Sequence, residues 1–300
     1  MYFVIVLRRA VAVLVLLVIA ITVLALRPMF VLAGLQLAGR SHCPWRATLR
    51  IPSESRRLEQ AQRSVARSVR MLSADGDLQH WEIPGAGRFW FVKSFGRLNA
   101  LVFAEQAAGI YSQGAVRPRL GDIVLDCGAD YGAFTRRALD AGARTVLAIE
   151  IAPEKEVCLK RTFAQEITDG RVVVIPRGVW DRDDMLPLDG DSVVLARGAA
   201  RRMAAVTTID KIVAEARLAR VDFIKMDIEG AEKRALKGAA GTLRRFRPRM
   251  AITAEHFPDD YRELPRAIRN IVPDYRVECG WCVEVRGRIL PYVLYFDPTP

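Results

Sequence analysis

Histidine and cysteine, the side chains most often found in nucleophilic and metal sites, are scarce in this sequence. It holds three histidines and five cysteines in 300 residues. The cysteines are odd in number and scattered, which is not the pattern of a disulfide framework and favours free thiols in a reducing compartment. Cys279 and Cys282 form a lone C-x-x-C in a β-rich stretch, without the helix start that redox chemistry needs or the second ligand pair that zinc needs. We therefore expect neither zinc binding nor thiol chemistry.

Acidic residues are also in deficit. The chain has 34 Asp and Glu against 45 Lys and Arg, a net charge of +11. This excess favours an anionic partner surface, made of lipid headgroups or nucleic acid, although a solvated basic face gives the same composition. Internal repeats and low-complexity segments are absent, and 51% of the residues are hydrophobic. The chain can therefore bury a core and is not disordered as a whole.

Long uncharged runs are confined to residues 1–40. The stretch from Ala10 to Leu26 carries no charge and lies at the lower edge of the roughly 17–25 residues that cross a bilayer. We predict a single-pass membrane anchor in residues 1–40, an anionic membrane surface as partner, and the rest of the chain on the cytoplasmic side. A cleaved secretory signal peptide is the alternative. Arginines at both ends of the run leave the orientation open by the positive-inside rule.

Residues 41–118 carry no motif of known chemistry. Apolar residues between Leu58 and Leu72 recur at helical spacing, two aromatic-rich runs on either side of a Gly-Ala-Gly turn predict a β-hairpin, and residues 98–111 predict a second helix. We expect an adaptor between the membrane and a domain at residues 119–300.

From Asp122 onward, short apolar runs alternate with helical segments. Helices separate most of these runs, and a β-rich tail follows; we expect strands at residues 122–126, 145–150, 171–176, 222–228 and 249–255. The alternation predicts a Rossmann-like α/β domain with a mostly parallel sheet and helices on both faces, and the tail suits an antiparallel edge.

The loop after the first of these strands, LDCGADYGAF, has the composition of a ligand site. Gly128 and Gly132 let the backbone turn tightly and approach a ligand, which in such sheets binds at the carboxyl ends of the strands. The spacing is not the G-x-G-x-x-G of pyrophosphate sites, and Asp126 would repel a pyrophosphate. Glu150, at the end of the next strand, can accept both hydroxyls of a ribose. A nucleoside with a cationic, amino-acid-like group fits this loop, and S-adenosylmethionine is such a compound.

The expected cofactor contacts follow from this placement. They come from the glycine loop, from the ends of the second and fourth strands, and from the turn RGVWD, which would border the adenine: Asp126, Gly128, Ala129, Tyr131, Gly132, Glu150, Val179, Asp181 and Asp227.

The order of these segments resembles the FkbM family of methyltransferases. The resemblance lies in VLDCGADYGAFT, AIE, VTTIDKI, VDFIKMDIEGAEKRALKGA and RPRMAITAEH, and the K-x-D-x-E-G-A-E block is its most specific part. The resemblance implies a class I methyltransferase fold with a seven-stranded sheet, S-adenosylmethionine as methyl donor, and usually an oxygen atom as methyl acceptor.

The stretch FIKMDIEGAE leads from a buried strand straight into acids. Asp227 falls at the carboxyl end of the strand and Glu229 in the turn, where uncompensated acids need a function. We expect Asp227 to meet the cofactor or the acceptor hydroxyl, and Glu229 to contact the substrate. Lys225 would be their ion-pair partner, and Glu232 would cap the next helix.

His256 is the only histidine at a strand end on the ligand side. We predict it as the general base of the reaction, with Asp227 as the second candidate, although a structural histidine is the alternative. Glu255 would orient His256 or bind substrate. No tight ligand spacing supports a metal site.

Together these features predict an S-adenosylmethionine-dependent O-methyltransferase acting on a hydroxyl of a sugar, lipid-linked or small-molecule acceptor. The basic charge makes an RNA methyltransferase the alternative. However, enzymes of this fold that methylate a base nitrogen usually carry an Asn-Pro-Pro-aromatic turn after the fourth strand. This sequence has DIEG at that place, so nucleic acid is not expected. A non-catalytic, membrane-tethered nucleotide-binding module is a third interpretation.

Overall fold

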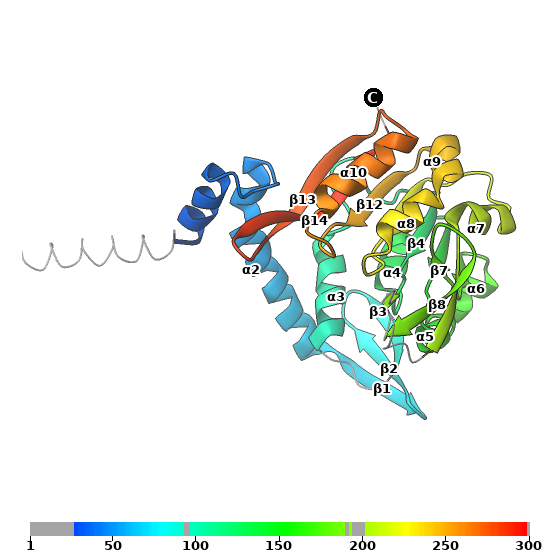
Figure 1. Cartoon of the computed structure of the whole chain (residues 1–300). Coiled ribbons are helices and arrows are strands. Elements are labelled where there is room, and N and C mark those ends of the chain that lie inside the picture. Colours follow the sequence, from blue (N-terminus) through cyan, green and yellow to red (C-terminus); the bar gives the residue numbers. More distant parts are fainter. Residues whose placement is uncertain (1–26, 93–96, 190–191, 194–201, 299–300) are drawn as a thin grey trace, which may run out of the picture.

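The computed structural model describes residues 27–92, 97–189, 192–193 and 202–298 (Figure 1). Within these ranges the largest sheet has seven strands in the order β13-β14-β12-β11-β4-β5-β6. The strands from β12 to β6 pair in parallel, whereas β14 is antiparallel to both β12 and β13. Their bounds are β4 Ile123–Cys127, β5 Thr145–Ile149, β6 Val172–Ile175, β11 Phe223–Met226, β12 Arg249–Thr253, β13 Arg276–Val285 and β14 Arg288–Asp297. The predicted mostly parallel, seven-stranded sheet is confirmed.

Helices cover both faces of this sheet because its central strands are apolar on both sides. All four residues of β11 are buried, and so are all five of β12. One core joins the sheet to α7 Ile209–Glu215, α8 Glu232–Lys237, α9 Ala240–Phe246 and α10 Asp260–Ile271. The other core joins it to α3 Arg97–Ala108, α4 Ala133–Asp140 and α5 Pro153–Thr162, which α6 Ala164–Thr168 follows.

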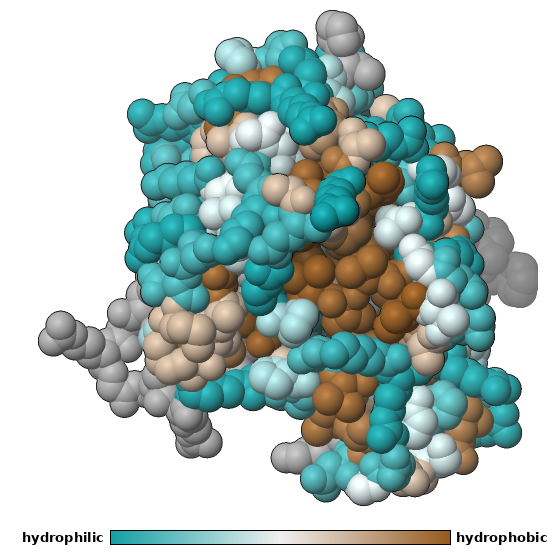
Figure 2. All heavy atoms as spheres, turned by 90° about the vertical axis from the view of Figure 1, so that its right-hand side faces the viewer, coloured by the Kyte–Doolittle hydropathy of each residue, from teal (hydrophilic) through white to brown (hydrophobic). Residues whose placement is uncertain are grey.

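Two smaller sheets flank the domain. The predicted hairpin is present as part of a three-stranded antiparallel sheet of β1 Arg70–Asp75, β2 Leu78–Ile83 and β3 Gly87–Val92. The predicted first helix is α2 Trp45–Ser68, but Leu72, which was expected in it, lies in β1. The second small sheet has the order β7-β10-β8-β9, over Gly178–Val179, Arg202–Thr207, Asp184–Asp189 and Ser192–Val193. Sequence reasoning missed it because Pro187 lies inside β8, and proline argues against an inner strand. Figure 2 views the side with β7, β8 and α7 and shows apolar side chains gathered between hydrophilic rims.

The membrane prediction is corrected by the structure. No helix in the described ranges is both long enough and apolar enough to span a bilayer. The described part of the predicted anchor, residues 27–37, is helical and packs on the protein, where Leu32 is buried beside Cys43 and Ile289. The uncharged run at residues 10–26 lies outside the described residues. The anchor, and the localisation inferred from it, are therefore withdrawn.

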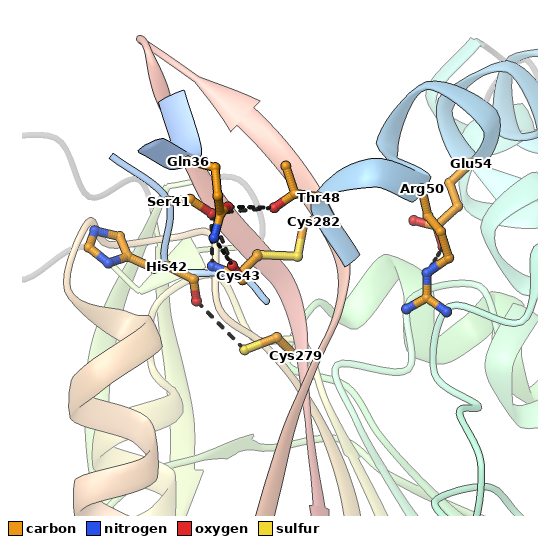
Figure 3. The surroundings of a disulfide bond; sticks show 9 residues. All are labelled: Gln36, Ser41, His42, Cys43, Thr48, Arg50, Glu54, Cys279 and Cys282. Atoms are coloured by element: carbon orange, nitrogen blue, oxygen red, sulfur yellow. Dashed lines mark hydrogen bonds and ion pairs between the residues drawn. A yellow bond between two sulfur atoms is a disulfide. The ribbon is translucent and has the colours of Figure 1, made fainter. Parts of the chain in front are cut away.

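The prediction that the cysteines stay unpaired is also wrong. Cys43, directly before α2, forms a disulfide with Cys282 in β13, whereas Cys279 keeps a free thiol that faces the carbonyl oxygen of His42 (Figure 3). The two partners are separated by 239 positions, so no local spacing revealed them. Because disulfides persist mainly in oxidising compartments, this bond argues against the predicted reducing compartment.

Candidate active site

The carboxyl ends of the central strands open into a cavity of about 550 Å³. Its walls come from the loops after β4, β5, β11 and β12, and also from α3 and β14. Nine of the predicted site residues line it: Gly128, Ala129, Tyr131, Glu150, Val179, Asp227, Glu229, Glu255 and His256. We call the half around the glycine loop and Glu150 the cofactor end, and the half around Asp227, Glu255 and Tyr292 the acceptor end.

The glycines of the first loop are required by its geometry. Gly128 has φ +77°, and a Cβ there would lie 1.9 Å from the backbone oxygen of Asp227. Gly132 has φ +90°, and a Cβ there would lie 2.3 Å from the Phe163 ring. Both positions combine a left-handed backbone with a close approach, which only glycine tolerates. The absence of side chains therefore lets the loop pack closely against the end of β11, and its backbone borders the cavity.

Glu150 is held in place by the loop that it faces. Its carboxylate accepts hydrogen bonds from the backbone N–H of Asp130 at 2.8 Å and of Ala152 at 2.9 Å, one on each oxygen. Burial raises its pKa, while Lys155 and these N–H donors oppose the rise. Each carboxylate oxygen keeps a lone pair, so the group can still accept ribose hydroxyls.

An apolar slot adjoins Glu150. Ile151, Val179 and Ile228 line the cavity there, and Gly178 leaves room because a Cβ would lie 2.6 Å from Ile151 Cδ1. Such a slot suits a flat, apolar-faced base beside a ribose-binding acid. The cofactor end therefore fits an adenosyl group.

Three predicted cofactor contacts, Asp126, Gly132 and Asp181, do not line the cavity. Asp126 is fully buried beneath the loop, where it accepts a hydrogen bond from the Thr135 hydroxyl at 2.7 Å and pairs with Lys225 at 3.3 Å. Lys225 is thus the partner of Asp126, and its ammonium also donates to the Gly128 carbonyl. Asp181 pairs outside the cavity with Arg234 at 2.7 Å. The direct cofactor role of both acids stays a prediction.

Asp227 stands where the two ends of the cavity meet. Its Oδ2 accepts a hydrogen bond from the Tyr111 hydroxyl at 2.8 Å, and its Oδ1 accepts one from Thr253 at 3.2 Å. These bonds fix the carboxylate at the carboxyl end of β11. A fixed acid there can meet the cationic part of the donor or an acceptor hydroxyl.

His256 is surrounded by carboxylates. Its Nδ1 lies 3.2 Å from Glu232, and its Nε2 lies 3.6 Å from Glu229 and 3.8 Å from Asp227. Burial alone would lower the pKa of His256, but Glu232, Asp227 and Glu229 outweigh it and raise the pKa to about 9. The ring is therefore an imidazolium at neutral pH and cannot accept a proton, which disfavours the predicted general-base role.

The same cluster has the geometry of a cation site, which a cation could occupy only after His256 loses its proton. One ligand atom each from Asp227, Glu229 and His256 lie within 4.8 Å of one another. The expectation of no metal stays a prediction. Glu232 does more than cap its helix, because it accepts from the Ile228 N–H at 3.0 Å and also holds His256.

Sequence reasoning missed three residues at the acceptor end. Tyr111 follows α3, Glu105 lies within it, and Tyr292 comes from β14, far from the glycine loop in sequence. One signal was available: Glu105 is the only acid in the run NALVFAEQAAGIY, and a lone acid in an apolar helix is uncommon.

A family model for the methyltransferase FkbM domain matches residues 126–280. Among solved structures the chain is similar to the methyltransferase FkbM of Methylobacillus flagellatus, with 20% identity, 83% of this chain and 60% of that chain covered, and a TM-score of 0.49. It is also similar to Trm5b of Pyrococcus abyssi, with 14% identity, 75% of this chain and 56% of that chain covered, and a TM-score of 0.41. A third similar structure is an S-adenosylmethionine-dependent O-methyltransferase of Thermotoga maritima, with 13% identity, 71% of this chain and 74% of that chain covered, and a TM-score of 0.36.

The chain spans less than two thirds of the first two of these structures. No curated protein matches its sequence. The family model covers more than half of the chain and includes both the glycine loop and the acidic end of β11. The protein therefore belongs to the FkbM methyltransferase family.

Proposed function

We propose that the protein transfers a methyl group to a hydroxyl of an uncharged sugar, lipid-linked or small-molecule acceptor. The observation that carries the proposal is the distribution of charge in the cavity. The acceptor end presents Glu105, Asp227, Glu229 and Glu255 around His256. The other basic residues that line the cavity are paired with acids: Lys225 with Asp126, Lys155 with Asp130 and Arg177 with Glu215. Carboxylates accept hydrogen bonds from hydroxyls and repel anions, so neutral polyhydroxylated acceptors are favoured over phosphate-rich ones.

S-adenosylmethionine, when bound, supplies an activated methyl group. Glu150 would hold the ribose, Ile151 and Val179 would flank the base, and Asp227 would face the sulfonium-bearing portion. The remaining work of the protein is to exclude water and to orient one hydroxyl oxygen toward the methyl carbon, because displacement reactions depend mainly on alignment.

An RNA acceptor is disfavoured by the same charges. The net charge of the chain is positive, but the basic residues of α2 lie on its exposed surface and not in the cavity. A phosphate backbone entering the acceptor end would meet acids from α3, β11 and β12. The predicted anionic partner surface remains a separate prediction that concerns the outside of the molecule.

The test uses the full-length protein and radiolabelled S-adenosylmethionine. Isothermal titration calorimetry first measures donor binding, and the protein is then incubated with separated glycan, lipid and RNA fractions from the host. We expect donor binding and label in the glycan or lipid fraction. Label confined to RNA would overturn the acceptor class, and a protein that does not bind the donor would overturn the proposal as a whole.

A further inference from the structure

The acceptor end contains a buried acid from outside the segment that matches the family model. Glu105 lies in α3, and its partner Tyr292 lies in β14, whereas the match covers residues 126–280. We propose that Glu105, positioned by Tyr292, accepts the proton of the acceptor hydroxyl during methyl transfer. This inference rests on the proposed function and adds to it the group that activates the acceptor.

The geometry places Glu105 in the cavity wall with a free oxygen. The residue is 7% exposed, its neighbour Ala104 is fully buried, and its carboxylate borders the cavity. The Tyr292 hydroxyl donates to Oε1 at 2.9 Å, which fixes the carboxylate and leaves Oε2 without a hydrogen-bond donor. Among the described residues, no Lys, Arg or His forms an ion pair with Glu105.

The surroundings of Glu105 favour a proton acceptor. Burial is the largest influence and raises its pKa to about 7; Asp227 and Glu255 add to the rise, while Tyr292 and Lys225 oppose it. A base works best when its pKa lies near the working pH, because it is then both available and basic enough. Near neutral pH a large fraction of Glu105 is therefore ionised, and this carboxylate is basic enough to take up a proton.

The other groups at this end are less suited to the role. Both ring nitrogens of His256 face carboxylates, Nδ1 at 3.2 Å from Glu232 and Nε2 at 3.6 Å from Glu229 and 3.8 Å from Asp227. Both oxygens of Asp227 already accept a hydrogen bond, from Tyr111 and Thr253, whereas Glu105 accepts one on a single oxygen. Glu255 is exposed, so water competes for its oxygens.

The proton and electron balance of the step is simple. The hydroxyl oxygen forms a bond to the methyl carbon while the methyl–sulfur bond breaks, and that electron pair stays on sulfur. The O–H bond breaks, its electron pair remains on oxygen, and the proton passes to Oε2 of Glu105. Glu105 afterwards returns the proton to solvent through the open cavity, so no further reactant is needed.

The experiment compares wild type with Glu105→Gln, Tyr292→Phe and the exposed control Glu59→Gln, using a panel of neutral methyl glycosides as acceptor probes. We expect donor binding by calorimetry to be unchanged in all four proteins. Methyl transfer by Glu105→Gln should fall about 100-fold to 10,000-fold, the range for loss of a general base. The control should match wild type.

The pH profile of kcat/KM separates a base from a structural residue. In wild type the rate should rise with pH through a midpoint near 7, and Glu105→Gln should lose this limb. Tyr292→Phe should move the limb to higher pH, because the Tyr292 hydroxyl lowers the pKa of Glu105. A ¹³C NMR titration of the glutamate carboxyl groups should show one signal near pH 7 that is missing in Glu105→Gln.

Each outcome decides something different. A Glu105→Gln enzyme with the wild-type rate and pH profile overturns the role of Glu105 and leaves the proposed function standing. A wild type that binds the donor but methylates no neutral glycoside counts against the acceptor class and against this inference with it. A wild type that does not bind the donor overturns the proposed function itself.

Discussion

The two ends of the cavity are built in different ways. The cofactor end comes mainly from residues 128–179, which follow β4 and β5 and include β7, and it is shaped largely by backbone: glycines at positive φ and N–H groups that fix one acid. The acceptor end is shaped by side chains from α3, β11, β12 and β14, which tertiary packing brings together. The first end depends on local conformation, whereas the second depends on the docking of distant segments, so different changes should damage them.

The largest expected effect is at the cofactor end. Gly128→Ala places a Cβ 1.9 Å from the Asp227 backbone oxygen at φ +77°. Strain and overpacking together should lower the free energy of unfolding by about 4 kcal/mol and abolish donor binding. Urea denaturation and calorimetry measure the two effects. Gly170→Ala is the matched control, since φ is +70° there but no atom lies within 4 Å, and it should cost only the strain.

Removing the disulfide tests whether the packing of α2 on α3 supports the acceptor end. Cys43→Ser removes the link between the start of α2 and β13, and α2 packs against α3, which carries Glu105. Stability should fall by about 3 kcal/mol, the middle of the range for a native disulfide. Donor affinity should stay unchanged, because the cofactor end is built elsewhere. Cys279→Ser, which keeps the disulfide, should be nearly neutral in thermal unfolding, and a loss of donor binding in Cys43→Ser would contradict the separation of the two ends.

Glu150→Gln tests the cofactor end alone, because it removes the charge of one side chain and keeps its shape. The amide keeps one acceptor oxygen but cannot accept both backbone N–H bonds and ribose hydroxyls on two oxygens. We expect donor affinity to fall tenfold to 100-fold, about 2 kcal/mol by the usual conversion. Calorimetry with Glu156→Gln as control, an acid on the neighbouring helix paired with Lys160, should show no such loss.

The smallest effect is a pH dependence at the acceptor end. The pKa of His256 is raised to about 9 from 6.5, so its contribution to stability is complete below pH 6.5 and is lost as pH rises through 9. His256→Gln should therefore destabilise the protein more at pH 6 than at pH 9.5, by about 1 kcal/mol after allowance for solvent screening.

Denaturant unfolding at the two pH values gives this difference. His80 is the control, because burial lowers its pKa, and His80→Gln should show the opposite trend. An equal loss of stability at both pH values in His256→Gln would show that the carboxylates do not hold a charged ring.

The sequence predicts which loops form the cofactor end because their signals are local, although Asp126 and Asp181 do not line the cavity. The run before Gly128, the acid ending β5 and the alternation of strands and helices each fall within a few residues of one another. Glu105 and Tyr292 escape such reasoning because their meeting depends on how α3 and β14 pack. The prediction placed His256 in the cavity, where it lies. No sequence pattern indicated that Glu232 contacts its Nδ1 and raises the pKa of the histidine.

The bond between Cys43 and Cys282 closes most of the polypeptide into a covalent ring. One protease cut anywhere between these two positions would leave both fragments attached to each other. On a denaturing gel a nicked molecule would keep its full mass and separate into two pieces only after a reductant is added.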